Sequence, residues 1–186
     1  AGNRLLVWGG QNEQGVLASG AQLLFGTNGL PSSWVPINVT GAPSGRLGHG
    51  AVWTRQRMLI WGGQGNGVFL GDGALYDPIA DTWSAVASAN APSARSAHGI
   101  TWTGQEILVH GGETAVGSTA DGAAYNPLTS SWRQLPGAGS PIPRSGSAFA
   151  WTGSVLLEFA GLSNGQPAAT LQQLNPQATW YLYRKP

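Results

Sequence analysis

The chain of 186 residues carries 9 Lys and Arg against 8 Asp and Glu, a formal net charge of +1, and it contains no cysteine. A charge so small and so evenly spread excludes a nucleic-acid-binding arm and a polybasic membrane patch. The lack of cysteine excludes disulfides, thiolate metal sites and a cysteine nucleophile. Apolar runs of only four to six residues cannot span a bilayer. Together with 29 glycines, 12 prolines and 9 tryptophans, these short runs predict an all-β chain.

The predicted strands come in groups of four. In the second group they span 49–54, 57–63 and 73–78, and a fourth strand follows 81–83. The third group repeats this order at 98–103, 106–112 and 122–127, with its last strand after 130–132. Small and bulky residues alternate along these segments, as in strands, and Asp77-Pro78 starts a turn because proline fixes φ. A Gly-Gly pair, or Ala160-Gly161 in the last group, closes each second strand, where the missing side chain lets neighbouring backbones approach closely.

The chain enters and leaves this pattern at different points. Arg46, Arg95 and Arg144 each precede the closing glycine of their group by 17 residues, but Gly10 has only nine residues ahead of it. We therefore expect the first group to lack its first strand. The last group ends with a fourth strand over 180–183, so the chain as a whole should form about 15 strands.

Four sets of residues repeat with one period. The Gly-Gly pairs and their equivalent follow one another at 53, 49 and 49 residues. One set of tryptophans has spacings of 49, 49 and 48 residues. The arginines are spaced 49 and 49 residues apart, and so is a second set of tryptophans. The sets are Gly9-Gly10, Gly62-Gly63, Gly111-Gly112 and Ala160-Gly161; Trp34, Trp83, Trp132 and Trp180; Arg46, Arg95 and Arg144; and Trp53, Trp102 and Trp151. This period predicts a single domain over 1–186, with units at approximately 1–40, 41–89, 90–138 and 139–186.

An apolar run into Gly-Gly, a tyrosine such as Tyr76 or Tyr125 before a turn, and then a tryptophan resemble the kelch repeat over essentially the whole chain. The resemblance implies four-stranded blades of a β-propeller around a central channel, with the first strand of each unit innermost. Kelch rings usually hold six or seven blades. Four units with an incomplete first blade are therefore part of a larger ring, a small four-bladed ring, or a ring completed by another chain that covers the unpaired strand edge. We expect a truncated or partner-completed propeller.

The resemblance also places Arg46, Arg95 and Arg144 in loops that converge at one mouth of the channel. In kelch-type adaptor proteins, residues at this place often contact the ligand, frequently an acidic peptide, and a guanidinium group binds a carboxylate with its planar fork. The alternative is that the arginines hydrogen-bond to the backbone of the neighbouring blade. Their recurrence in unit after unit favours that alternative.

Two histidines follow these arginines by three residues, His49 and His98, and Ser147 takes their place in the fourth unit. They should lie near the channel as further candidate ligand contacts. Two neutral imidazoles one blade apart could share a metal. No carboxylate or third histidine recurs with them, so we predict no metal site and expect hydrogen bonds to backbone or water instead.

Two residues of the second strands break the repeat. His110 occupies an aromatic position, and a packed imidazole explains it. Glu158 stands where the other units have valine or isoleucine, and a carboxylate there must reach water, pair with a cation or carry a proton. Arg144 is a candidate partner. Glu158 is a better functional candidate than a residue that obeys the repeat, although an edge blade that tolerates polarity explains it equally well.

The most variable parts of the units are 11–19, 64–72, 113–121 and 162–170, between the second and third strands. Variable loops on a rigid ring commonly carry binding specificity. These loops carry Val68, Phe69 and Leu70, which we expect to be exposed, together with Glu13, Glu113 and several amides.

The sequence contains no Gly-x-Ser-x-Gly elbow, phosphate loop or Cys–His pair. We therefore predict no catalytic residue and no cofactor, and expect an interaction module that binds a protein segment or partner subunit through the mouth loops. One alternative is a secreted, lectin-like propeller that binds carbohydrate. Another is a kelch-type sugar mutarotase with Arg144, Glu158 or His98 as acid or base. Abundant Ser, Thr, Gln and Asn favour a secreted or periplasmic protein, with a cytoplasmic location as the alternative.

Overall fold

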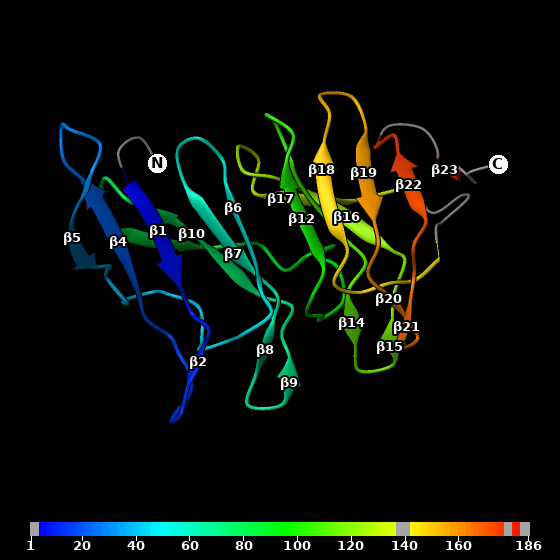
Figure 1. Cartoon of the computed structure of the whole chain (residues 1–186), viewed down its shortest axis with the longest axis horizontal. Helices are drawn as coiled ribbons and strands as arrows, with labels where there is room; N and C mark the ends of the chain where they lie inside the picture. The colour runs from blue at the N-terminus through cyan, green and yellow to red at the C-terminus, as the bar shows by residue number, and fades with distance from the viewer. Residues whose placement is uncertain (1–3, 137–141, 177–179, 183–186) are drawn as a thin grey trace.

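The computed structural model describes residues 4–136, 142–176 and 180–182, which form 23 strands and no helix (Figure 1). No described segment is thus a helix that could cross a membrane. Fifteen strands form four antiparallel sheets, blades 1 to 4, and the other eight pair as four small hairpins. The predicted all-β fold is confirmed, and among the described residues the first blade has three strands, without an innermost one.

Each complete blade has its second strand inside the sheet and its first strand at the inner edge. Blade 1 holds β1 (Arg4–Trp8), β4 (Gly20–Phe25) and β5 (Pro31–Pro36). Blade 2 holds β6 (Gly50–Trp53), β7 (Met58–Trp61), β10 (Gly73–Asp77) and β11 (Thr82–Ala85). Blade 3 holds β12 (Gly99–Trp102), β13 (Ile107–His110), β16 (Gly122–Asn126) and β17 (Ser131–Gln134). Blade 4 holds β18 (Ala148–Trp151), β19 (Leu156–Phe159), β22 (Leu171–Leu174) and β23 (Trp180–Leu182).

The variable loops are themselves structured, because each contains a two-stranded hairpin. The pairs are β2 (Gln11–Asn12) with β3 (Gly15–Val16), β8 (Gln64–Gly65) with β9 (Val68–Phe69), β14 (Glu113–Thr114) with β15 (Gly117–Ser118), and β20 (Leu162–Ser163) with β21 (Gln166–Pro167). In blade 2 the turn is Asn66-Gly67, with φ of 50° and 80°. Two central residues of positive φ are the turn that matches the twist of a hairpin. Val68 at its end is exposed, whereas Phe69 and Leu70 are half-buried.

The hydrophobic core lies between neighbouring blades rather than within one sheet. The central strands β7 and β13 are buried along their whole length. Trp61 of β7 packs against Tyr125 and Trp132 of blade 3, while Ile60, on the other face of β7, packs against Trp8 of blade 1. Blade 2 is therefore stabilised by the blades on both of its faces.

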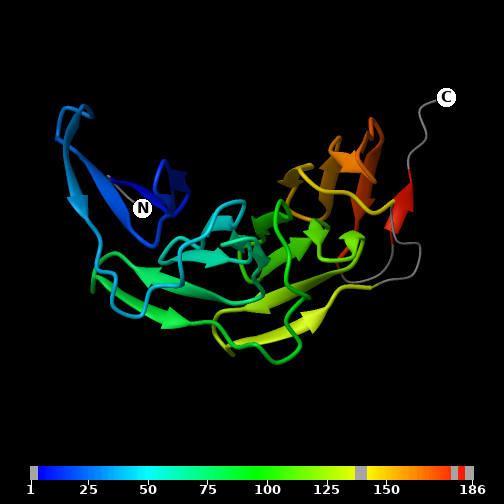
Figure 2. The same ribbon diagram turned by 90° about the horizontal axis from the view of Figure 1, so that it is seen from below.

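The four blades follow one another along an open arc, with blades 1 and 4 at its two ends (Figure 2). The outer face of blade 1 exposes Leu5, Val7 and Trp34, and the outer face of blade 4 exposes Phe159 and Leu171. These positions are the ones that face a neighbour in the middle of the arc. The end blades thus leave apolar sheet faces uncovered within the described residues.

Candidate interaction face

One end of every blade gathers the loops that lead into the innermost strands. Because the sheets are antiparallel, the start of β6, the end of β7 and the start of β10 meet at the same end of blade 2. The loop before β6 packs on blade 1, since Arg46 N donates to Leu17 O at 3.3 Å, and Arg95 N donates to Leu70 O at 3.1 Å in the next pair of blades. The four hairpins project from this end (Figure 1). We call it the mouth face, and the end with the turns between first and second strands the opposite face.

The guanidinium groups of Arg46, Arg95 and Arg144 are buried at the mouth face. Nη1 of Arg46 donates to the carbonyls of Gly62 and Asp72 at 2.9 and 3.0 Å. Gly62 directly follows the second strand of the same blade, and Asp72 directly precedes the third. Arg95 and Arg144 make the same two bonds in their blades. The side chains therefore hold the inner loop to the blade that it enters.

The carbonyl groups of the same arginines bond to the preceding blade. Gly10 N donates to Arg46 O at 2.9 Å, and Gly63 N donates to Arg95 O at 2.8 Å. Gly63 needs to be glycine, because its φ is +97° and a Cβ would lie 2.8 Å from Leu47 O. The expected bond to the neighbouring blade thus comes from the main chain, while the side chain bonds within its own blade. Direct ligand contact by these arginines stays a prediction.

Two carboxylates lie over the arginines, and sequence reasoning missed both. Asp72 binds Arg46 through both oxygens, at 3.0 and 3.1 Å, and 62% of its side-chain surface is exposed. Asp121 binds Arg95 at 2.9 and 3.1 Å, with 54% exposed. Burial alone would raise the pKa of Asp121, but the Thr119 hydroxyl and the Arg95 guanidinium hold that pKa below its usual value. The available signal was the 49-residue spacing of the two aspartates, equal to that of their arginines.

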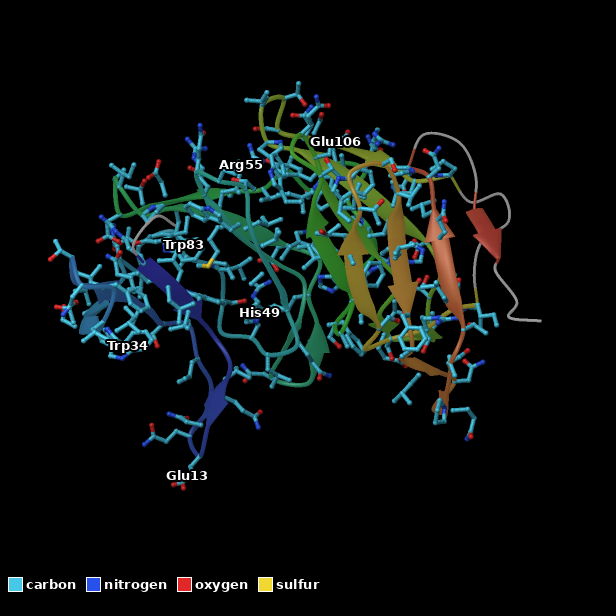
Figure 3. The ribbon with its side chains drawn as sticks, turned by 45° about the horizontal axis from the view of Figure 1, so that its top comes forward. Glu13, Trp34, His49, Arg55, Trp83 and Glu106 are labelled. Atoms are coloured by element: carbon cyan, nitrogen blue, oxygen red, sulfur yellow. The ribbon has the colours of Figure 1, made fainter. Side chains whose placement is uncertain are left out.

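The solvent-facing charge of the mouth face is therefore acidic. Glu13, Asp72 and Asp121 are exposed there, Glu113 is half-exposed, and no described Arg or Lys on this face reaches solvent. The opposite face carries exposed cations among its acids, such as Arg55 and Arg57. Figure 3 shows Glu13 at the tip of the first hairpin, at the other end of the blades from Arg55 and Glu106.

His49 and His98 fill the contact between neighbouring blades. The ring of His98 meets the indole of Trp61 edge-on, with the centroids 5.2 Å apart, and a Cβ on Gly62 would lie 2.7 Å from its Cε1. His49 stands in the same way against Trp8, at 5.6 Å. Neither ring nitrogen of His98 has a hydrogen-bond partner within the described residues, so the expected bond to backbone is not made.

The environment of His98 favours its neutral form. Burial, and then the positive charges of Arg95 and His49, lower its pKa to about 3. His98 therefore packs between blades 2 and 3 as a buried, uncharged ring. Among the described residues, no group of three His, Asp or Glu is placed to hold a metal ion.

The two residues that break the repeat face each other between blades 3 and 4. Glu158 Oε2 lies 3.4 Å from His110 Nδ1, and its Oε1 lies 3.9 Å from Arg144 Nε. His110 Nε2 lies 2.9 Å from Ala120 O, and because a carbonyl oxygen only accepts, this nitrogen donates. Gln172, with its amide oxygen toward Arg144, accepts from that guanidinium group. The cluster is buried, and Arg144 is indeed a partner of Glu158.

The opposite face holds a cleft of about 560 Å³ between blades 3 and 4. Its walls include the indole of Trp151, the amide of Gln105 and the hydroxyl of Ser154. Arg133 and Glu106 close one side with a bidentate ion pair at 2.9 and 2.6 Å. No sequence prediction pointed to this cleft, because its residues come from turns and strand ends in two different units.

A comparison with known families matches almost the entire chain. The family described as the KLHDC2/KLHL20/DRC7 Kelch-repeats domain matches residues 1–184. No curated protein matches the chain. The family match covers all four blades and includes the inner loops and the hairpins of the mouth face.

Proposed function

Because the chain belongs to the kelch-repeat family, whose domains generally serve as protein-interaction modules, we propose that its mouth face binds a segment of a partner protein. The hairpins support this proposal, since they differ in sequence among the units and stand on one side of a rigid arc. The inner loops between them are fixed by the buried arginines. A ligand would meet a preformed surface.

The charge of the mouth face indicates the class of that segment. The arginines that suggested an acidic peptide are buried, and the groups that reach solvent over them are Asp72 and Asp121. With Glu13 on the hairpin of blade 1 and Glu113 on the hairpin of blade 3, this surface attracts cationic side chains. The exposed aspartates are the observation that carries the proposal: the ligand is a segment rich in Arg or Lys.

A pair of charged probes tests this proposal. We expect the chain to bind a labelled oligo-arginine peptide in a salt-dependent way, and to bind an oligo-glutamate peptide far less. The double variant Asp72→Asn with Asp121→Asn should weaken oligo-arginine binding by at least about tenfold, or about 1.4 kcal/mol. Asparagine keeps an acceptor for the buried arginine, and a thermal melt verifies that the variant is folded.

The matched control lies on the opposite face. Glu106→Gln also removes one carboxylate, half-buried in this case, from an arginine, and it should leave oligo-arginine binding unchanged. The double variant removes two charges and the control one, so a loss of binding free energy in the control half as large as in the double variant would mean that binding follows net charge alone. Preference for oligo-glutamate would contradict an acidic mouth and favour ligand contact by the arginines.

Carbohydrate binding is the second candidate function, and the cleft on the opposite face is the observation that favours it. A partly buried indole beside an amide and a hydroxyl offers a sugar both an apolar surface and hydrogen bonds. A glycan array should then show binding that Trp151→Ala removes and that the double aspartate variant retains. An array without any binding would reject this function.

A further inference from the structure

The turn that joins the first two strands of blade 2 departs from the repeat at one residue. Arg55 lies there, whereas blades 3 and 4 have Gly104 and Gly153 at the same position. The φ of Arg55 is 74°, and those of the two glycines are 104° and 101°. A residue with a side chain is strained in this left-handed region, and such strain gathers at functional sites. Blade 2 thus carries an arginine where glycine fits the backbone better.

The charge of Arg55 is not compensated within the protein. Its side chain is exposed and makes no hydrogen bond or ion pair with any described residue. Arg57, two residues along, has Asp77 Oδ2 at 3.8 Å from its Nε. Glu106, at the same end of the blades as Arg55 (Figure 3), is bound by Arg133. The guanidinium group of Arg55 is therefore available to an anionic ligand.

Arg55 lines a second cleft of the opposite face, which lies between blades 2 and 3 and has a volume of about 480 Å³. Its walls include Trp102 and the amides of Gln105 and Asn126. Leu128, 93% exposed, adds an apolar surface. Asn126 Oδ1 accepts from Leu128 N at 2.9 Å, so its amide nitrogen remains free to donate to a ligand. An apolar ring beside amide groups is a surface that suits a sugar.

The two clefts of the opposite face form one groove. They share a wall, the turn at Gly104 and Gln105. Trp102 and Trp151 end the innermost strands β12 and β18, which are neighbours along the arc. Two half-buried indoles therefore lie one blade apart in a groove that runs from blade 2 to blade 4. A ligand that contacts both indoles must be extended, with rings that repeat along its length.

We propose that this groove binds an acidic oligosaccharide, a linear chain of uronic-acid units. The two tryptophans pack against sugar rings, the amides bind hydroxyl groups, and Arg55 binds a carboxylate with its planar fork. Amide groups beside flat indole surfaces favour a hydroxyl-rich ring over the side chains of an acidic peptide. The inference rests on the carbohydrate-binding function proposed for the cleft between blades 3 and 4 and is independent of the acidic mouth face.

Charged sugars and a neutral counterpart are the probes. They are the tetramers of galacturonic acid and of mannuronic acid, and the galacturonic acid tetramer with every carboxylate methyl-esterified, which keeps the rings and loses the charge. We expect calorimetric titration of the full chain to show that an acidic tetramer binds at least about tenfold more tightly than the methyl ester. An oligo-glutamate peptide of the same charge should bind far less than that tetramer.

Arg55→Gly separates binding from folding, because it restores the residue that the other units have. This variant should bind the acidic tetramer at least about tenfold more weakly. It should melt no lower than the wild type, since glycine adopts this φ without strain. The matched control is Arg57→Gln, which removes the neighbouring cation that lies beside Asp77 and should leave the affinity unchanged. Trp102→Ala should weaken the binding of every sugar that occupies the groove.

Each other outcome overturns the proposal in a distinguishable way. If neither acidic tetramer binds, or the methyl ester binds equally well, the groove does not recognise an acidic sugar. If neutral glycans bind and are lost in Trp151→Ala but retained in Arg55→Gly, the carbohydrate-binding function stands and this inference alone fails. Equal binding of oligo-glutamate would make an acidic peptide the ligand. Equal loss in Arg55→Gly and Arg57→Gln would mean that only net charge matters.

Discussion

The arginine of each inner loop makes bonds through both its side chain and its carbonyl. A buried guanidinium group is tolerated only when its donors are satisfied. Arg46 meets this need with the carbonyls of Gly62, Asp72 and Ser44 and with the Asp72 carboxylate. Lysine has no planar fork that could reach two strand ends at once. The bonds that hold the inner loop to its blade thus explain why arginine recurs. In blade 2 the side chain that reaches solvent at this place is Asp72, which binds the buried Arg46.

His98 provides a prediction at the same scale. Its pKa of about 3 in the folded chain lies far below the ordinary value of 6.5. Below pH 6.5 the unfolded chain gains a proton that the folded chain does not, so stability falls as pH decreases toward 3 and is unaffected above 6.5. Between pH 7.5 and 5 this loss amounts to about 2 kcal/mol. The lowered pKa values of Asp77, Asp81 and Asp121 change the stability only at pH values near and below 3.8, the ordinary pKa of an aspartate.

The measurement is urea unfolding of the wild type and His98→Leu at pH 7.5 and pH 5. We expect the wild type to lose more stability on acidification than the variant. His49→Leu is the control, because His49 is half-buried and should account for less of the pH dependence. An unchanged pH dependence in His98→Leu would show that His98 is not a buried, uncharged ring.

At the scale of strands and loops, local repetition predicted most of what was found. The period of 49 residues located the four sheets and the missing strand, because each unit contains the strands of one blade. The hairpins were missed, although Asn66-Gly67 and Asn164-Gly165 are strong signals for a two-residue turn. The four loops differ in most of their residues, but two of them share an Asn-Gly pair, which is the residue pair that favours such a turn.

The contacts of site residues were less predictable than the strands that carry them. Sequence spacing put His110 and Glu158 in equivalent strands of different units, but only the packing of blade 3 on blade 4 brings them within 3.4 Å of each other. The same holds for Asp72, whose exposure depends on how the third strand meets the arginine loop. His110 and Glu158 both replace apolar residues of the repeat, and they do so in adjacent units. This coincidence in the sequence is a signal that the two polar side chains contact each other.

At the scale of the whole molecule, stability comes from contacts between blades, so equivalent residues should differ in energy according to their place in the arc. Trp132 is 4% exposed, packs on Trp61 with ring centroids 5.5 Å apart, and donates from Nε1 to Ala87 O at 2.8 Å. Trp34, at the same position of blade 1, is 53% exposed. No described blade covers the outer face of blade 1, which lies at one end of the arc (Figure 2).

We therefore expect Trp132→Ala to lower the free energy of unfolding by about 3–5 kcal/mol, the range for large aromatic truncations in a core. Trp34→Ala should cost at most about 1 kcal/mol, because most of its surface is already in water. Urea unfolding of both variants at two protein concentrations measures the difference. A large, concentration-dependent cost for Trp34→Ala would contradict the open arc, since it would mean that the outer face of blade 1 is buried against another chain in solution. A large cost at every concentration would instead require a contact of Trp34 within the chain.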